Sequence, residues 1–141
     1  MELSSKEKGN LTELQCITRC YELGYRVSIP YGENSRYDFI LDTGNKLYRV
    51  QCKTSSKVDE ECFKFSCRST RVNATQTISK RYTEEEIDYF CTFYEGKCYL
   101  VHVSECGIEK NLRYCYPRNG QKKGISLAEN YEIEKVLKQS A

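Results

Sequence analysis

Residues 36–54 read RYDFILDTGNKLYRVQCKT. This stretch is the most informative part of the sequence for predicting the fold. Residues 37–41 and 47–54 are two strand-like runs, rich in β-branched, aromatic and aliphatic side chains. The intervening segment, residues 42–46, reads DTGNK and is a strong hairpin signal. The stretch therefore predicts an antiparallel hairpin.

A two-residue turn at the glycine and asparagine of this hairpin sets the pairing. Asp38 then lies opposite Gln51, and Arg36 lies opposite Lys53. Directly paired residues share a face, so a carboxylate, an amide and an ammonium gather on one side of the sheet, together with Arg49. A three-residue loop would shift the pairing by one and turn Asp38 to the apolar side.

The remaining segments predict a single mixed α/β (α+β) domain. Apolar periodicity and capping patterns favour helices over residues 4–23, 83–89 and 126–137. Strand patterns occur at residues 25–30, 63–68, 90–94, 98–103 and 112–116. Residues 69–81 are polar and without periodicity, which predicts a long loop. We expect residues 1–141 to form one domain with a mixed β-sheet flanked by helices.

Composition narrows the function class only slightly. Lys and Arg number 22 against 20 Asp and Glu, so net charge alone does not indicate a nucleic-acid partner. Residues 1–20 contain no signal-peptide core, and no stretch has the length of a membrane span. We therefore expect a cytoplasmic, intracellular protein that has no membrane partner.

The nine cysteines pose a separate question. Disulfides are rare in the cytosol, and an odd number cannot pair completely within one chain. Zinc sites favour tight CxxC pairs or Cys/His clusters, whereas this chain has a single CxxxC spacing and one histidine. We expect the cysteines to be small core residues, with no structural zinc.

The polar face of the hairpin has the groups that metal-assisted phosphodiester hydrolysis requires. Mg²⁺ prefers carboxylate and carbonyl oxygens, which Asp38 and the backbone of Cys52 can offer. Lys53 is placed to hold a water molecule or to balance phosphate charge, and Glu13 is a candidate second acid from the first helix. A carboxylate beside a lysine also occurs on an ordinary solvated sheet, so the residues alone leave both interpretations open.

The order of these residues resembles a known nuclease signature. Asp38, twelve intervening residues and then Gln51-Cys52-Lys53 resemble the PD-(D/E)XK motif. Residues 8–13, KGNLTE, are similar to the helical K-G-x-x-x-E element of its resolvase-like branch. Residues 32–55, 82–90 and 128–132 resemble blocks of the small PD-(D/E)XK endonucleases associated with group I introns.

This resemblance implies a restriction-endonuclease-like core and cleavage of double-stranded DNA with Mg²⁺, or with Mn²⁺ as a substitute. Glu13 and Asp38 would be metal ligands, and Lys53 would activate water or stabilise charge. Two positions depart from the motif: Tyr37 replaces its proline, and Gln51 replaces its acid. Glutamine is an accepted variant in the intron-encoded branch, where the resemblance gives it a role as amide-oxygen ligand or water-positioner.

A basic segment accounts for DNA contact. Between Lys46 and Arg81 there are nine Lys or Arg residues against three acids. Cationic side chains neutralise phosphates, and amide or hydroxyl groups contact base edges. The candidate DNA-binding residues are Arg36, Arg49, Ser55, Lys57, Lys64, Arg68, Arg71, Asn73, Thr75, Gln76, Lys80 and Arg81. A solvated surface is the alternative interpretation.

Cleavage of both strands by one small active site favours a homo-oligomer, either a dimer or a tetramer. A C-terminal face formed by Ile133, Val136 and Leu137 and the second hairpin are candidate interfaces. The leading hypothesis is a sequence-specific intron-homing endonuclease. The alternatives are a Holliday-junction-type resolvase, a non-catalytic DNA-binding protein with a decayed nuclease site, and a zinc-binding interaction module.

Overall fold

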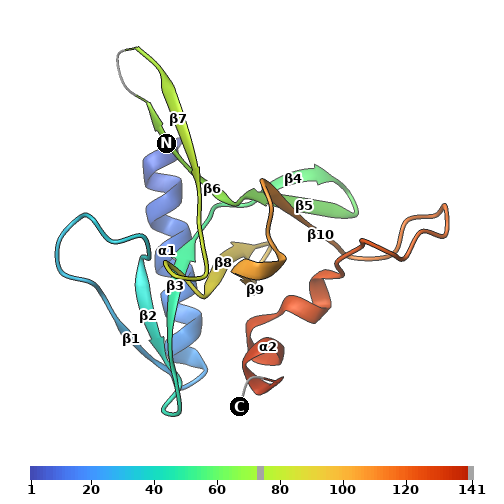
Figure 1. Cartoon of the computed structure of the whole chain (residues 1–141). Coiled ribbons are helices and arrows are strands. Elements are labelled where there is room, and N and C mark those ends of the chain that lie inside the picture. The colour runs from blue at the N-terminus through green and yellow to red at the C-terminus, as the bar shows by residue number, and fades with distance from the viewer. Residues whose placement is uncertain (73–74, 140–141) are drawn as a thin grey trace.

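The computed structural model describes residues 1–72 and 75–139 and has an α+β architecture (Figure 1). The helical elements are α1 (Ser5–Glu22), the 3-10 turns η1 (Val103–Glu105) and η2 (Ala128–Tyr131), and α2 (Ile133–Gln139). The strands are β1 (Arg26–Ser28), β2 (Phe39–Asp42), β3 (Leu47–Cys52), β4 (Ser56–Asp59), β5 (Cys62–Ser66), β6 (Arg68–Val72), β7 (Thr77–Arg81), β8 (Tyr89–Tyr94), β9 (Lys97–His102) and β10 (Glu109–Arg113). No helix of the described residues is long and apolar enough to cross a membrane.

A five-stranded mixed sheet forms the centre, in the order β1-β2-β3-β8-β9. The hairpin β2–β3 has the predicted pairing: Phe39 lies opposite Val50, and the Thr43 amide donates to the Lys46 carbonyl at 3.1 Å to close a two-residue turn. Gly44, at φ 90°, supplies the left-handed conformation that this turn requires. β8 joins β3 in parallel, and the other neighbouring pairs are antiparallel.

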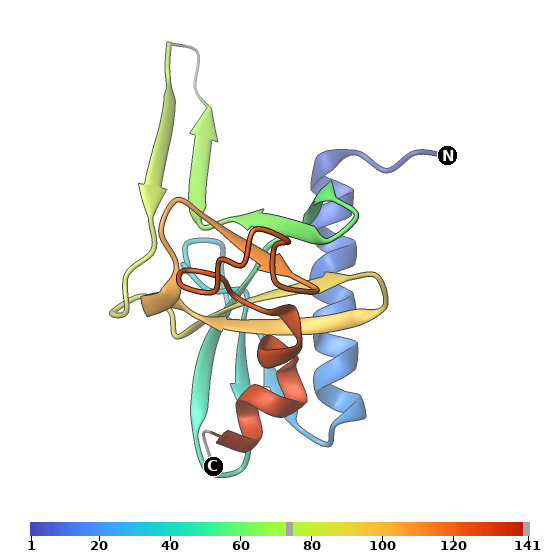
Figure 2. The ribbon, with the colours of Figure 1, turned by 90° about the vertical axis from the view of Figure 1, so that its right-hand side faces the viewer.

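The two faces of this sheet are covered differently (Figure 2). On one face, side chains of β2, β3, β8 and β9 pack with Cys16 and Cys20 of α1 and with Ile133 and Leu137 of α2. On the other face, Phe90 and other residues pack against a three-stranded sheet of order β10-β5-β4. The hairpin thus lies between a helical layer and a second sheet.

Helix α1 begins and ends as its sequence predicts. Ser4 accepts from the Glu7 amide at 3.2 Å, and Glu7 accepts from the Ser4 amide at 3.0 Å, which completes a capping box. Cys16 and Cys20 are fully buried against the sheet. Gly24, at φ 87°, turns the chain toward β1. This helix holds Glu13 beside the hairpin.

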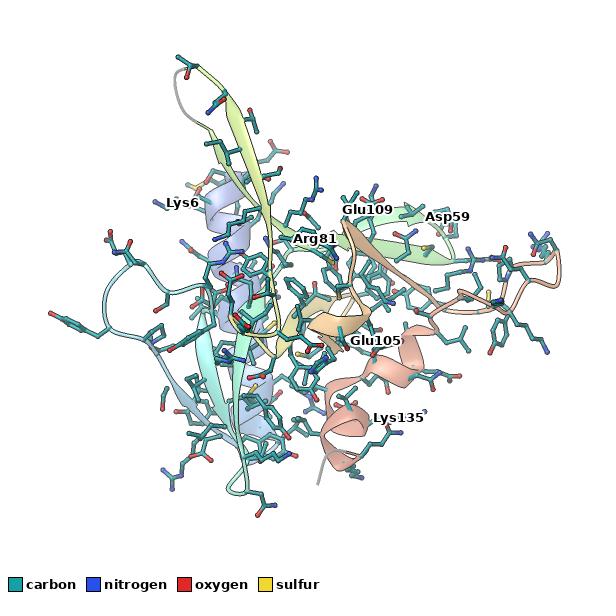
Figure 3. The ribbon with its side chains drawn as sticks, viewed as in Figure 1. Lys6, Asp59, Arg81, Glu105, Glu109 and Lys135 are labelled. Atoms are coloured by element: carbon teal, nitrogen blue, oxygen red, sulfur yellow. The ribbon has the colours of Figure 1, made fainter. Side chains whose placement is uncertain are left out.

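Residues 69–81 were predicted as a loop, but residues 69–72 and 77–81 instead belong to a two-stranded ribbon of β6 and β7 that projects from the body (Figures 1 and 2). Every residue of β7 is exposed, so this strand has no buried face to impose an alternating apolar pattern. The prediction failed for that reason. Figure 3 labels Arg81, the last residue of β7, where the ribbon returns to the body.

Two of the predicted helices also differ. The Thr83 amide donates to the Glu86 carboxylate, and the Glu86 amide donates to the Thr83 carbonyl, which forms a single turn. No helix follows, because Ile87 enters the core and Tyr89 starts β8. The C-terminal helix is split into η2 and α2, because Glu132 between them bridges to Tyr99 of β9. Strand β4 was missed; all its residues are exposed.

Candidate active site

Asp38 is fixed at the open end of the hairpin by two backbone groups of β3. Its amide donates to the Val50 carbonyl at 2.8 Å, and its Oδ2 accepts from the Cys52 amide at 2.8 Å. Burial raises the pKa of this half-buried carboxyl group, while the Cys52 amide and the charge of Lys53 act in the opposite direction. The carboxylate therefore points across the end of β3.

Glu13 comes from α1 to the same place. Burial and the negative charge of Asp38 both raise the pKa of Glu13, so the two carboxyl groups are close enough to repel each other. The helix is tied to the chain just after β3 by the Thr12 and Thr54 hydroxyl groups, whose oxygens are 3.0 Å apart. Helix and hairpin thus bring two acids together from distant parts of the sequence.

Lys53 extends this group of residues. Its Nζ donates to the Arg68 carbonyl at 2.7 Å and lies 5.2 Å from the centre of the Tyr82 ring. Burial lowers the pKa of Lys53, and the negative charge of Asp38 raises it. The lysine is thus held between Asp38 and the first residue of the ribbon.

Gln51 makes the contacts that the hairpin register predicts. With its amide nitrogen facing the acceptors, it donates to Asp38 Oδ2 at 3.3 Å and to the Arg36 carbonyl at 2.7 Å. The amide oxygen then accepts from the Tyr82 hydroxyl at 3.3 Å. Tyr82, the residue that follows the ribbon, thus helps to hold the Gln51 side-chain amide in place.

Arg36, predicted as a DNA-binding residue, uses its donors inside the protein. Nε donates to Glu86 Oε2 at 2.8 Å, Nη1 to Ser69 Oγ at 2.8 Å and Nη2 to the Arg81 carbonyl at 2.9 Å. The guanidinium also stacks over Tyr82, 3.8 Å from the ring centre. Arg36 therefore holds the base of the ribbon against the active-site hairpin.

Arg49 and Ser55 are also engaged internally. Arg49 Nη2 donates to Asp88 Oδ1 at 3.1 Å and to the Glu84 carbonyl at 2.8 Å, which fixes the turn before β8. The hydroxyl oxygens of Ser55 and the buried Thr92 lie 2.7 Å apart. These contacts give both residues structural roles.

The other candidate DNA-binding residues fall into two groups. Lys57 and Lys64 lie on the three-stranded sheet and form ion pairs with Glu60 and Glu109. The ribbon and its connecting turn carry Arg68, Arg71, Thr75, Gln76, Lys80 and Arg81, while Asn73 lies outside the described residues. The structure thus places the larger group on one projecting element.

Tyr82 is the site residue that the sequence reasoning missed. It contacts Gln51, Arg36 and Lys53, and it packs edge-on against Phe90 at 5.3 Å between ring centres. The sequence offered one indication, that this aromatic residue directly follows a basic segment. Because the ribbon was not predicted, nothing in the sequence placed Tyr82 next to the hairpin.

Comparison with known proteins agrees with this arrangement. The chain matches the family described as PD-(D/E)XK endonuclease over residues 3–134. The chain belongs to the PD-(D/E)XK endonuclease family. A comparison with curated proteins gives no match.

Among solved structures, this PD-(D/E)XK endonuclease is similar to a bacterial homing endonuclease, I-Ssp6803I, with a TM-score of 0.78 and 23% sequence identity. The match covers 98% of this chain and 95% of that chain. The likeness confirms the predicted fold class, a mixed sheet with flanking helices in a PD-(D/E)XK arrangement.

The expectation of no structural zinc in this endonuclease rested on the spacing of cysteines along the sequence. The fold weakens that expectation, because it places the sulfur atoms of Cys16, Cys91 and Cys98 within 4.8 Å of one another, where they could hold a metal ion. Sequence spacing does not detect a group assembled from one helix and two strands.

Proposed function

We propose that this PD-(D/E)XK endonuclease is a Mg²⁺-dependent homing-type enzyme that cleaves both strands of DNA at a specific sequence, inside the cell. The observation that carries the proposal is the convergence of Glu13 and Asp38, close enough to repel, beside the half-buried ammonium of Lys53. On an ordinary solvated sheet, a carboxylate from a helix and a carboxylate from a hairpin would not be expected to meet at half-buried positions.

The donor set fits a divalent cation. Two half-buried carboxylates that repel each other are stabilised by a cation placed between them. Cys52 directs its amide toward Asp38, and the amide and carbonyl of one strand residue point to the same side, so its carbonyl also faces this place. Glu13, Asp38 and the Cys52 carbonyl would hold Mg²⁺. The Gln51 amide, whose nitrogen faces Asp38 and whose oxygen faces Tyr82, would act as a water-positioner and not as an amide-oxygen ligand.

Bound Mg²⁺ supplies charge neutralisation and a more acidic water. The protein's own groups supply the rest. Lys53 offers an ammonium to the scissile phosphate or its attacking water, and the low-polarity surroundings strengthen that interaction. Tyr82 and the Arg36 carbonyl orient the Gln51 amide, so the polar face is arranged before DNA binds.

The β6–β7 ribbon is the element best suited to DNA recognition. A two-stranded ribbon fits the major groove, where base pairs can be distinguished. The exposed Lys80 and Arg81 are available to phosphates beyond their internal partners, and Thr75 and Gln76 are exposed in its connecting turn. We assign phosphate and base contacts to this element, and structural roles to Arg36, Arg49 and Ser55.

A homo-oligomer remains part of the proposal, because one chain presents one candidate active site. The predicted C-terminal interface is corrected: Ile133 and Leu137 are 0% and 5% exposed and belong to the core of the chain itself. Analytical ultracentrifugation of the DNA-bound protein tests this part, and a single chain per cleaved duplex would contradict it.

Asp38→Asn is the decisive variant. The asparagine keeps an oxygen that can accept from the Cys52 amide but loses the negative charge. We expect cleavage of a target-containing plasmid with Mg²⁺ to fall at least about 100-fold, equivalent to ~2.7 kcal/mol of transition-state stabilisation. Glu33→Gln, in the exposed loop before the site, is the matched control and should cleave normally.

Three outcomes have distinct meanings. Wild-type cleavage by Asp38→Asn removes the assigned site. Target binding by the wild type without nicking in Mg²⁺ or Mn²⁺ favours a decayed nuclease. Preference for a four-way junction over every linear duplex favours the resolvase.

A further inference from the structure

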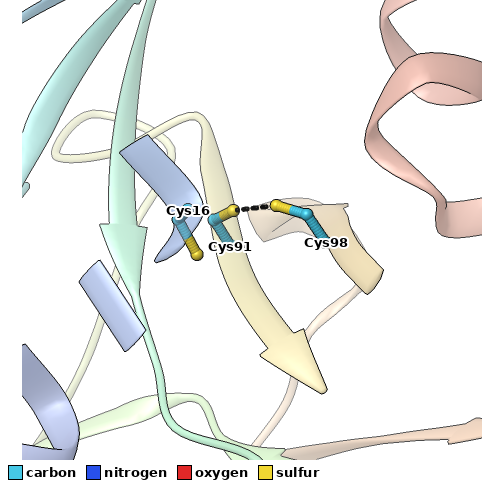
Figure 4. A group of neighbouring side chains, drawn as sticks. All are labelled: Cys16, Cys91 and Cys98. Atoms are coloured by element: carbon cyan, nitrogen blue, oxygen red, sulfur yellow. Dashed lines mark hydrogen bonds between the residues drawn. The ribbon is translucent and has the colours of Figure 1, made fainter. Parts of the chain in front are cut away.

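Four cysteines meet beneath the candidate active site, on the helix-covered face of the central sheet. Cys16 comes from α1, Cys52 from β3, Cys91 from β8 and Cys98 from β9, and all four belong to the same buried cluster. Figure 4 shows Cys16, Cys91 and Cys98 gathered at one place. None of the four takes part in the nuclease chemistry through its sulfur.

The sulfur atoms are close together. Those of Cys91 and Cys98 lie 3.3 Å apart, and those of Cys16, Cys91 and Cys98 are all within 4.8 Å of one another. Cys52 belongs to the same buried cluster, and its thiol lies near those of Cys16 and Cys91. The cluster therefore has a compact triad of sulfur atoms and a fourth buried thiol beside it.

A disulfide does not suit the closest pair. Cys91 is paired with Leu100 and Cys98 with Phe93, so the two cysteines are diagonal neighbours on antiparallel strands. Diagonal neighbours have Cα atoms about 7–8 Å apart, beyond the usual span of a disulfide. Their thiols are close to each other, but their Cα atoms are too far apart for a disulfide bond.

The separations do suit a tetrahedral thiolate site. Zinc–sulfur bonds of about 2.3 Å at tetrahedral angles place neighbouring sulfurs roughly 3.8 Å apart. The sulfurs of Cys91 and Cys98 are 3.3 Å apart and those of Cys16, Cys91 and Cys98 all lie within 4.8 Å of one another, so small side-chain rotations bring these three to such positions. Cys52, from the same buried cluster, would turn toward them as the fourth ligand. We propose that Cys16, Cys52, Cys91 and Cys98 bind one Zn²⁺ ion as thiolates. Each thiol gives its proton to the solvent when the metal binds.

The surroundings offer a route for an ion. Cys98 lines a groove of about 590 Å³ between α1 and the β8–β9 turn. Arg19 and Lys97 also line this groove, and both are paired with carboxylates of the chain. The groove gives an ion access to the edge of the cluster.

The position of the site gives it a structural role. Cys16 lies three residues after Glu13 on the same helix, the Cys52 amide donates to Asp38, and the Cys91 carbonyl accepts from the Lys53 amide at 2.9 Å. A zinc ion would therefore join α1, which carries Glu13, to β3 and β8, whose Cys52 amide and Cys91 carbonyl hold Asp38 and Lys53. This inference does not depend on the chain being an active nuclease.

The wild-type protein gives the first test. Purified from zinc-containing medium, it should carry about one Zn²⁺ per chain, and after exchange with Co²⁺ it should show thiolate-to-cobalt charge transfer in the near ultraviolet. A folded wild-type protein with less than about a tenth of a zinc ion per chain and no such band after exchange overturns the proposal.

Variants locate the metal. Cys98→Ser should lose the bound zinc and the cobalt band, whereas Cys62→Ser, at a buried position on strand β5 of the three-stranded sheet, and the exposed Cys115→Ser should keep both. Asp38→Asn should also keep the band, which separates this site from the proposed Mg²⁺ site. Full zinc content and an unchanged cobalt band in Cys98→Ser would contradict the assignment, and the wild-type test stands if that variant does not fold.

Discussion

The Nζ of Lys53 donates to the carbonyl of Arg68 at 2.7 Å, so the candidate catalytic hairpin is joined directly to the first residue of the projecting ribbon. The other end of the ribbon is held in the same way, since Arg36 donates to the Arg81 carbonyl. Both ends of the proposed DNA-recognition ribbon are therefore held by hydrogen bonds from residues in or beside the candidate active site.

Lys53→Met should separate cleavage from binding. Methionine keeps an unbranched apolar stem but removes the ammonium. We expect cleavage to fall by about 100-fold or more, because charge stabilisation in a shielded site contributes several kcal/mol to such reactions. Target affinity, measured by gel shift with Ca²⁺ in place of Mg²⁺, should change only a few-fold.

Lys57→Met is the matched control, because this lysine is exposed on β4 and paired with Glu60. It should leave cleavage intact. Equal loss of cleavage and binding in Lys53→Met would argue that the lysine serves DNA affinity alone.

The metal-free protein should gain stability when Asp38 loses its charge. The pKa values of Asp38 and Glu13 are raised in the folded state. Each protonated carboxyl group therefore adds to the free energy of unfolding at pH values below its unfolded pKa, and this contribution is lost as the pH rises through its folded pKa. At pH 7 in EDTA, Asp38→Asn should therefore raise Tm by ~2–5 °C. The gain should vanish near pH 3, where the wild-type carboxyl groups are protonated.

Differential scanning calorimetry at both pH values, without and with Mg²⁺, measures this effect. Added Mg²⁺ should stabilise the wild type and not Asp38→Asn. A variant less stable than the wild type at pH 7 in EDTA would show that the Cys52 hydrogen bond to the charged carboxylate outweighs the cost of burying that charge.

Tyr82→Phe should test the link between Gln51 and the ribbon. The substitution removes the hydroxyl that donates to the Gln51 amide oxygen and keeps the ring on which Arg36 stacks. We expect cleavage to fall by about 10-fold, corresponding to ~1.4 kcal/mol for a lost positioning hydrogen bond. The Mg²⁺ concentration for half-maximal cleavage should rise as well, a change that a purely structural tyrosine would not produce.

Tyr31→Phe removes the hydroxyl of a fully exposed tyrosine and serves as the comparison. If both tyrosine variants cleave at the wild-type rate with the same Mg²⁺ requirement, Tyr82 has no positioning role.

Lys80→Ala should reduce the salt dependence of DNA binding. Lys80 lies on the ribbon with a side chain that is 68% exposed. Loss of one phosphate contact should lower the slope of log K against log salt by about 0.9. Lys138→Ala, on α2, is the control, and a slope unchanged in both variants would place the phosphate contacts away from Lys80.

The hairpin could be predicted from sequence because its turn and its alternation agree, and Asp38 and Gln51 lie together as that register requires. The encounter of Glu13 with Asp38 is tertiary; the residues alone made Glu13 a candidate second acid, and the resemblance to a nuclease family supported that choice. The ribbon could not be predicted, because β7 has no buried side and leaves no periodic pattern. Tyr82 was missed for the same reason, and the cysteine cluster because its members come from four separate elements.

The exposed ribbon has a consequence for how such a protein can change. Thr77, Ser79 and their neighbours on β7 are exposed, so substitutions there disturb little of the packed interior. The residues that anchor the ribbon, Arg36, Ser69 and Tyr82, are a separate set. Under the proposed role of the ribbon in DNA recognition, mutational drift in its outer part would supply new target preferences while the candidate hydrolytic centre is inherited unchanged.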